Sequence, residues 1–297
     1  MNKGTIAGIR RGSRFSPNHI GNDAAIFSLT ASRLREMGYV VNEYAETDLQ
    51  IETCDETAIF SMARDVGAVR RLKQMEDEGR MVVNSGYGIE NCTRERMTRL
   101  LMSNSIAHPY SIIVDTAGDP VHMLEEAGFD NCWIKRGDFH AIHREDVTYV
   151  RHLDEAGDIL REYAMRGIET AVINEHLAGD LVKFYGIAGA DFFYWFYPTA
   201  IPGRHSKFGL EKINGQARGI PFDEERLHRL CTAAAGILNI KIYGGDCIVA
   251  DDSSIRLIDF NDWPSFAPCR NEAAIHIAEC IHHFIERYEK RTYAVGH

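Results

Sequence analysis

The chain has 297 residues, of which 45% are hydrophobic, so it can bury a substantial core and form two or three modest domains. Its formal net charge is -10, from 43 acidic and 33 basic side chains, so neither a nucleic-acid backbone nor an anionic membrane is an expected partner. No apolar run approaches the roughly 20 residues that span a bilayer, and seven scattered cysteines without a Cys-x-x-Cys pair are typical of reduced thiols in a cytoplasmic protein.

The first third of the sequence alternates short apolar runs with amphipathic stretches, which is typical of strands and helices around a parallel sheet. The runs predict strands at residues 5–9, 39–44, 58–62 and 81–84. Apolar residues at helical spacing predict one helix from Asn22 or Asp23 to Gly38, and another around residues 69–75. The order of these elements is that of successive βαβ units.

The remaining sequence predicts a more mixed arrangement. Helices are expected at residues 93–104, 121–127 and 152–166, and strands at 111–114, 132–135 and 146–150. Strand formers dominate residues 171–197, and the loop at 203–219, rich in Gly, Lys, Arg and His, is a candidate substrate-facing segment. A helix at 222–238, a hairpin of strands 241–250 and 254–260, and a helix at 271–289 complete the chain.

The strongest local signal is a group of oxygen-bearing side chains on this hairpin. Alternation points Asp259 and Asn261 to one face of their strand, and Asp246 on the neighbouring strand can converge with them. Two carboxylates and an amide oxygen are the hard ligands that Mg²⁺ prefers when phosphates and waters complete its coordination. The alternative is that these are polar hairpin residues facing water. Because Val249, Ile255 and Leu257 surround them, we favour the metal site.

Two segments of this hairpin, Tyr243-Gly244-Gly245-Asp246-Cys247 and the run from Leu257 to Phe266, resemble the metal-binding end of the ATP-grasp superfamily. Asp259 stands where Glu is usual in that family, and Ser265 where Gly is common. The resemblance implies an N-terminal α/β domain over residues 1–90, a small central lid domain over 91–174 and a C-terminal α+β domain over 175–297. ATP and Mg²⁺ would lie in the cleft between the last two.

The resemblance also implies residues that bind the nucleotide. Lys135, at the end of an apolar strand, resembles the phosphate-binding lysine of the family, although residues 138–143 contain none of the glycines expected in the flap that follows. Arg94 would replace a second phosphate-binding lysine. Other residues resemble the hinge strand that meets adenine, the ribose-binding acid and a cation facing phosphate or acceptor: Glu175 to Leu177, Asp180 and Lys183. Their alternative readings are solvated surface cations and a simple hairpin.

Acceptor-binding residues carry a weaker signal. The residues after the first strand lie where an open parallel sheet places its ligand crevice, and they include Arg10, Arg11, Ser16 and Asn18. Basic residues near the loop and the hairpin are further candidates for stabilising charge during the reaction: Arg204, Arg218 and Arg270. All of these arginines have an alternative role in surface ion pairs of an acidic protein.

The family likeness is to the ribosomal-protein glutamate ligase and D-alanine:D-alanine ligase types, which implies an ADP-forming carboxylate–amine ligase acting through an acyl phosphate. The implied partners are small-molecule carboxylate and amine acceptors, with a peptide as an alternative acceptor. A kinase that phosphorylates a small polyol or other hydroxyl remains open, as does a nucleotide-binding regulator without turnover. The acceptor is not specified by the sequence, and the oligomeric state stays open, with a homodimer as one alternative.

Overall fold

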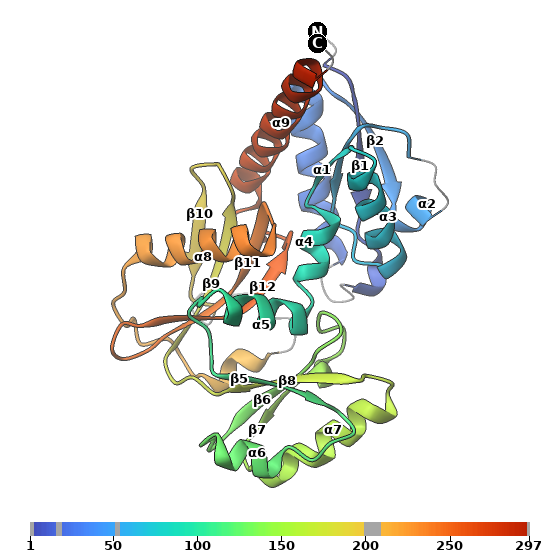
Figure 1. Cartoon of the computed structure of the whole chain (residues 1–297). Helices are drawn as coiled ribbons and strands as arrows, with labels where there is room; N and C mark the ends of the chain where they lie inside the picture. The colour runs from blue at the N-terminus through green and yellow to red at the C-terminus, as the bar shows by residue number, and fades with distance from the viewer. Residues whose placement is uncertain (1–2, 16–19, 51–53, 199–208, 296–297) are drawn as a thin grey trace.

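The computed structural model describes residues 3–15, 20–50, 54–198 and 209–295, which form three units, each built on a four-stranded sheet (Figure 1). The first sheet is parallel, and the other two are antiparallel. Among the described residues, no helix combines the length and the apolar character required to cross a membrane. All seven cysteines are buried and free.

The N-terminal unit is a parallel sheet in the order β2-β1-β3-β4 with helices on both faces. Along β1 the side chains alternate, so Ile6 packs toward α1 and α9, whereas Ala7 and Ile9 pack toward α3. Asp65 begins α3 because its carboxylate accepts hydrogen bonds from the backbone N–H groups of the first turn. The elements are β1 (Thr5–Arg10), α1 (Ile20–Glu36), β2 (Val40–Ala45), α2 (Glu46–Gln50), β3 (Ala58–Ser61), α3 (Val66–Asp77), β4 (Met81–Val83) and α4 (Gly86–Asn91).

The small central unit is an antiparallel sheet in the order β5-β8-β6-β7, covered on its outer face by α6 and α7 (Figure 1). Cys132 and Ile134 of β6 pack against these helices, so the alternate residues Trp133 and Lys135 point to the opposite face. The elements are α5 (Arg94–Ser103), which precedes the sheet, β5 (Ser111–Asp115), α6 (Val121–Glu126), β6 (Cys132–Arg136), β7 (Val147–Val150), α7 (Ala156–Met165) and β8 (Thr170–Glu175).

The C-terminal unit follows the same rule, with one helix-covered face and one open face. Val182 and Phe184 of β9 pack with α8 and α5, so Lys183 lies on the other side of the sheet, whose order is β10-β9-β11-β12. Asp223 caps α8, and Asn239 ends it in the left-handed conformation. The elements are β9 (Asp180–Ile187), β10 (Phe193–Phe196), α8 (Glu224–Leu238), β11 (Ile242–Val249), β12 (Ile255–Asp262) and α9 (Arg270–Val295).

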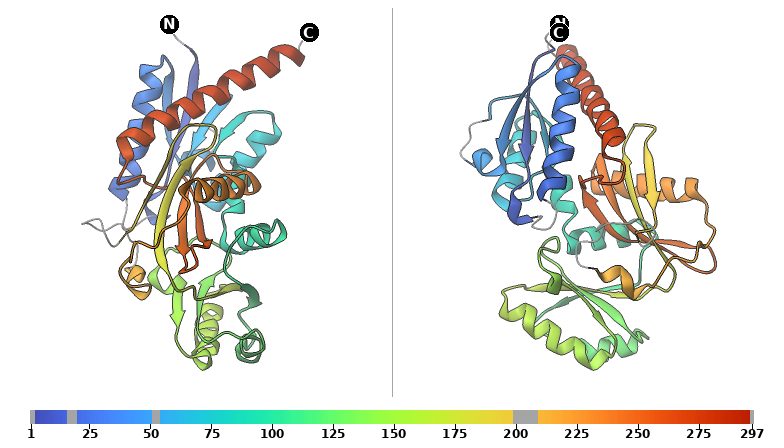
Figure 2. Two further views of the ribbon diagram at one scale, coloured as in Figure 1. Left: turned by 90° about the vertical axis from the view of Figure 1, so that its left-hand side faces the viewer. Right: turned by 180° about the vertical axis from the view of Figure 1, so that it is seen from behind.

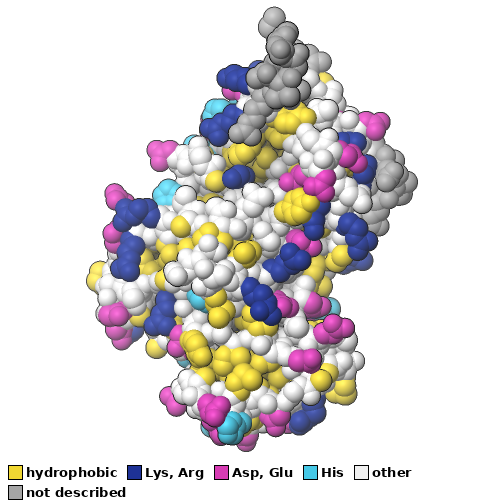
Figure 3. Space-filling model, in the orientation of Figure 1, with side chains coloured by type: hydrophobic (Ala, Val, Ile, Leu, Met, Phe, Trp, Pro, Cys, Tyr) yellow, Lys and Arg dark blue, Asp and Glu magenta, His cyan; other side chains and the backbone are white. Residues whose placement is uncertain are grey.

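The long helix α9 returns to the N-terminal unit and lies beside α1 (Figure 2). Ala273, Ala274 and Ile277 of α9 share one core with Ile26 of α1 and Trp263 at the end of β12. The N-terminal and C-terminal units are therefore joined by a continuous hydrophobic core. On the face seen in Figure 3, basic side chains are interspersed with acidic ones rather than gathered in one patch.

Candidate functional site

The open faces of the two antiparallel sheets border a cavity of about 310 Å³. Lys135 of β6, Lys183 of β9 and Asp246 of β11 line it, together with residues from the N-terminal unit at one end. A volume of this size is at the lower end of the range for small-molecule pockets, roughly 300–1,000 Å³. The cavity has a polar centre, with an apolar end on one side of it and a polar end on the other.

The polar centre is built from neighbouring strands in register. Asp246 pairs with Lys183 on one side and with Asp259 on the other, and a β-bulge follows Asp246. Asn261 lies two residues beyond Asp259 and also lines the cavity. The close approach of β11 to β12 requires glycine at position 245, where a Cβ atom would lie 2.2 Å from the carbonyl oxygen of Asp259. The structure thus brings together the three predicted metal ligands.

Each of the two carboxylates is already paired with a cation. Lys183 Nζ donates to Asp246 Oδ1 at 2.7 Å, and Arg94 Nη1 lies 3.3 Å from Asp259 Oδ1. Burial raises the pKa of Asp259, but Arg94, Lys135 and His140 outweigh it and lower that pKa to about 2. Asp259 is therefore charged at neutral pH.

Lys135 is only 6% exposed and points into the same centre. Its Nζ donates to the carbonyl oxygen of Ile258 at 3.2 Å. Burial and the neighbouring Arg94 lower its pKa to about 7, although Asp259 and Asp246 act in the opposite direction. A buried amine of this kind has spare N–H donors for an anionic ligand.

The donor set of the centre fits a hard divalent cation. Asp246, Asp259 and the amide oxygen of Asn261 supply oxygen only, which suits Mg²⁺. The described residues include no group of three or more His, Cys, Asp or Glu side chains placed to hold a metal by themselves. Two carboxylates and an amide are instead the incomplete set that Mg²⁺ uses when phosphate oxygens supply the remaining ligands.

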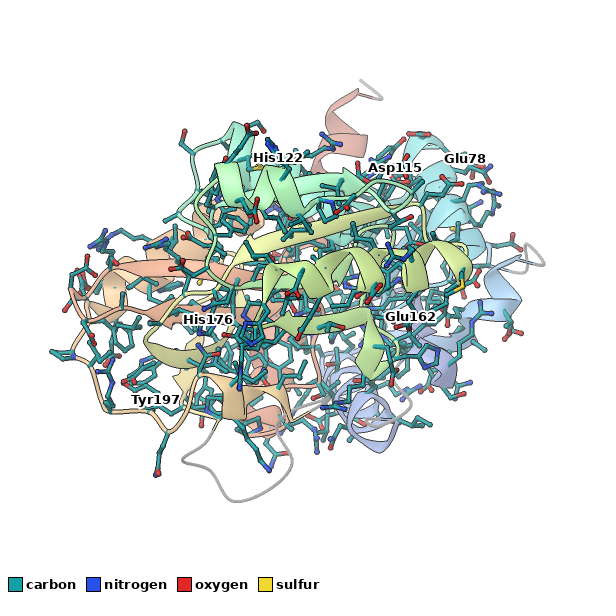
Figure 4. All side chains as sticks on the ribbon, turned by 90° about the horizontal axis from the view of Figure 1, so that it is seen from below. Glu78, Asp115, His122, Glu162, His176 and Tyr197 are labelled. Atoms are coloured by element: carbon teal, nitrogen blue, oxygen red, sulfur yellow. The ribbon has the colours of Figure 1, made fainter. Side chains whose placement is uncertain are left out.

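The apolar end is formed by a small cluster of Leu177, Leu181 and Ile248, with Ile258 packed against it. Trp133 and His176 form the facing wall, and Trp133 Nε1 donates to His176 Nδ1 at 3.1 Å. Figure 4 shows His176 and, well apart from it on the rim of the small unit, His122. This end offers flat aromatic and aliphatic surfaces, which suit a planar heteroaromatic ring.

Residues 175–177, predicted as the hinge, lie at this apolar end. The Glu175 carboxylate accepts from Tyr110 N at 2.8 Å and from Arg256 Nη1 at 2.7 Å, so it fixes the end of β8. The carbonyl oxygen of Leu177 accepts from Asn214 Nδ2 at 3.1 Å. Both residues line the cavity.

The expectation for Asp180 requires correction. Its carboxylate is 1% exposed, does not line the cavity, and accepts from the backbone N–H groups of Arg218 and Ile220, each at 2.8 Å. Asp180 is the first residue of β9, and its side chain lies on the face of the strand opposite to that of Lys183. There it anchors the segment that precedes α8. It holds a loop rather than facing a ribose.

The polar end of the cavity is formed where all three units meet. Asp262, at the end of β12, is 1% exposed and accepts from Arg64 and Arg11 of the N-terminal unit. His140, on the loop after β6, places Nε2 3.1 Å from Asp262 Oδ1. Burial and then Arg64 lower the pKa of His140 to about 4, although Asp262 opposes this, so the ring is neutral at pH 7.

The acceptor-site expectation for Arg11 is changed by these contacts. Arg11 lines the cavity, but its guanidinium donates to Met62 O, Asp23 and the residues at the end of β12, so it is a structural bridge. Arg64 uses Nε and Nη2 on Asp262, and Nη1 has no hydrogen-bond partner among the described residues. Arg64 is thus the better placed of the two for an anionic group.

Three of the other predicted acceptor and catalytic residues are described by the structure and do not line the cavity. Arg10 is exposed. Arg218 is also exposed, and its Nη2 pairs with Asp251 at 2.5 Å. Arg270 Nη2 donates to Asn22 Oδ1 at 2.7 Å and so links α9 to α1. None of these three arginines lines the cavity, so their acceptor and catalytic roles stay predictions. The remaining candidates lie outside the described residues: Ser16, Asn18 and Arg204.

Several cavity residues were not predicted. Trp133 and Tyr185 lie two residues from Lys135 and Lys183 on their strands, so the period of two would have found them. Arg64 and His140 lie on loops, where no periodic signal exists, and only the packing of the three units brings them to the cavity.

No protein-family model and no curated protein matches this sequence. Solved structures match it over nearly its whole length. The D-alanine–D-alanine ligase from Bacillus anthracis complexed with ATP has a TM-score of 0.67 at 15% identity, covering 96% of this chain and 97% of that one. The corresponding ligase from Coxiella burnetii has a TM-score of 0.68 at 11% identity, covering 99% and 98%. The ATP-grasp ligase PsnB complexed with a minimal precursor has a TM-score of 0.60 at 15% identity, covering 95% and 99%.

At these identities the likeness describes the fold. The likeness extends over nearly all of both chains in each comparison. The fold class expected from the sequence is therefore confirmed.

Proposed function

We propose that this protein, a chain with the ATP-grasp fold, is an ATP- and Mg²⁺-dependent carboxylate–amine ligase. The observation that carries the proposal is the convergence of Lys135, Lys183 and Arg94 with Asp246 and Asp259 in one cavity. Three cations and two acids in one enclosed space are what a bound polyphosphate and its metal ion require.

The cavity suggests how ATP would lie. The adenine would occupy the apolar end beside Leu177 and Ile248, and the phosphates would extend to the polar centre. Mg²⁺ would be held by the acids and the amide of Asp246, Asp259 and Asn261, and when bound it would neutralise phosphate charge. The protonated amine of Lys135 would contact the phosphate oxygens and neutralise part of their charge.

The chemistry follows from this placement by analogy with the fold. An oxygen of the acceptor carboxylate would attack the γ-phosphorus of ATP while the bond to the β-phosphate oxygen breaks, which gives ADP and an acyl phosphate. An amine would then attack the carbonyl carbon, lose a proton and displace phosphate. Lys135, Lys183 and Arg94 would stabilise the charge on the transferred group throughout.

The acceptor carboxylate would enter from the end where the three units meet. Arg64 presents Nη1 there, and the hydroxyl-bearing ring of Tyr185 lines the same part of the cavity beside Gly244. These two residues take over the acceptor-binding role that the sequence alone assigned to the arginines after β1.

The test is a nucleotide-product screen over amino acids, small carboxylates and polyols, singly and in pairs. A ligase releases ADP and phosphate only when a carboxylate and an amine are both present, whereas a kinase releases ADP without free phosphate. Asp259→Asn keeps the shape of the side chain and is expected to lower the rate by at least ~100-fold. If no mixture consumes ATP faster than this variant, the ligase proposal is wrong.

A further inference from the structure

The loop of residues 137–143 connects β6 to a short 3-10 helix, Arg144–Asp146, and forms one wall of the polar cavity through His140 and Ala141. After Gly137 it contains no glycine. A loop without glycine has fewer accessible backbone conformations than a glycine-rich one, so it loses less conformational entropy when contacts hold it in one position.

Both ends of this loop are fixed within the small unit. Gly137 N donates to the carbonyl oxygen of Thr170 at 2.8 Å, where a Cβ atom at position 137 would lie 2.6 Å from the Thr170 hydroxyl. At the other end the backbone N–H groups of Ile142 and His143 donate to Asp146 Oδ2 at 2.8 and 2.9 Å. Any opening of the loop must therefore involve its middle, residues 138–141.

The middle of the loop contacts both of the other units. Phe139 packs against Phe15 of the N-terminal unit, with ring centroids 5.5 Å apart. His140 is buried, and its Nε2 has no well-directed hydrogen bond but lies 3.1 Å from Asp262 Oδ1 of the C-terminal unit. The contact is therefore an attraction between the neutral imidazole dipole and a charged carboxylate that Arg64 and Arg11 hold in place.

We propose that His140 is a positioning residue which, together with Phe139, ties loop 137–143 across the polar end of the cavity, so that nucleotide exchange requires these two contacts to break. The identity of the ligand, a nucleotide, rests on the proposed function, whereas the attachment of the loop rests on the contacts of Phe139 and His140 described above. It assigns the loop a closed position that is set by side chains of three units rather than by glycine flexibility.

The experiment compares His140→Ala and Phe139→Ala with His140→Gln, which keeps a dipolar N–H group, and with His122→Ala as the control. His122 is 83% exposed on α6 of the same unit. The first readout is the dissociation rate of fluorescent methylanthraniloyl-ADP measured by stopped flow. The second is hydrogen–deuterium exchange of the amides of residues 137–143 in the nucleotide-free protein, with the unfolding temperature of each variant recorded alongside.

The rate of dissociation is expected to rise about five- to tenfold in His140→Ala, as for the loss of an ordinary polar contact, and to return to within about threefold of wild type in His140→Gln. Phe139→Ala should also speed dissociation, and exchange within the loop should rise in both alanine variants but not in His122→Ala. A purely structural role would lower the unfolding temperature without this local change.

The possible failures are distinguishable. If wild-type protein does not bind the fluorescent nucleotide, the proposed function fails. If it binds and neither alanine variant changes the dissociation rate by more than twofold, the positioning role of His140 is wrong. Unchanged loop exchange in His140→Ala would overturn the tie even when no nucleotide binds.

Discussion

The lowered pKa of Lys135 leads to a prediction about proton uptake. In the nucleotide-free protein this amine is buried, has one backbone acceptor and lies near Arg94, so its pKa is about 7. A polyphosphate placed against it would favour the charged form and raise that pKa. Binding of ATP above pH 7 should therefore draw a proton from solution onto Lys135.

The size of the effect follows from the titration of a single group. With a pKa of about 7, Lys135 is about 97% neutral at pH 8.5 and about 24% neutral at pH 6.5. If bound phosphate raises the pKa above roughly 9.5, ATP binding takes up about 0.9 proton at pH 8.5 and about 0.25 at pH 6.5. Uptake should thus grow as the pH rises through this range.

Isothermal titration calorimetry in two buffers of different ionisation enthalpy measures this uptake directly. Lys135→Met, which keeps the length of the side chain, should bind ATP more weakly and should take up about 0.9 proton less than wild type at pH 8.5. Any protons that ATP itself exchanges on binding are common to both proteins, so they cancel when the uptake of Lys135→Met is subtracted from that of wild type. Equal uptake in wild type and Lys135→Met, or uptake that falls as the pH rises, would refute the reasoning.

Three further predictions concern the metal carboxylates and their surroundings. Lys183→Met should free Asp246 from its 2.7 Å ion pair and tighten Mn²⁺ binding to the nucleotide-free protein by about tenfold, measured by electron paramagnetic resonance; unchanged affinity would contradict this. Gly245→Ala should lower the unfolding free energy by about 1–3 kcal/mol in urea, because its Cβ would lie 2.2 Å from Asp259 O; a smaller change than that in Gly236→Ala, where no atom lies within 4 Å, would count against it. The cationic neighbours of buried Asp262 hold its pKa below the ordinary value, so its contribution to the free energy of unfolding should be complete above the unfolded pKa of about 4 and decrease as the pH falls below it. In acid titrations, Asp262→Asn should therefore lose less unfolding free energy per pH unit than wild type does.

The strands and their faces could be predicted because their pattern is local. On β9 and β11 the period of two assigns Lys183 and Asp246 to the face opposite the neighbouring core residues that pack with α8. On β12 Asp259 and Asn261 alternate with buried Phe260, whereas the β-bulge before Asp259 is what separates their face from that of Leu257. The hairpin brings two of these strands together within a few residues, so the grouping of its acids required no long-range information.

The roles of the arginines could not be predicted in the same way. In the sequence, Arg11 and Arg270 look the same as a substrate-binding arginine. Only the structure shows which groups their guanidinium groups bind: Asp23 and Asp262 for Arg11, and Asn22 for Arg270. Asp180 was misread for the same reason, because the backbone amides that it binds come from a segment nearly forty residues later, Arg218 to Ile220.

The sequence by itself determined the alternation of strands and helices, the sheet faces and the acidic hairpin, because side-chain periodicity is imposed by the backbone within each element. Only the tertiary structure decided that Lys135 meets that hairpin, that Arg64 but not Arg11 has a guanidinium nitrogen with no partner among the described residues, and that His140 reaches Asp262. The physical reason is that hydrogen bonding, burial and pKa depend on atoms brought close by packing between units, and a sequence pattern records spacing along the chain but not those contacts.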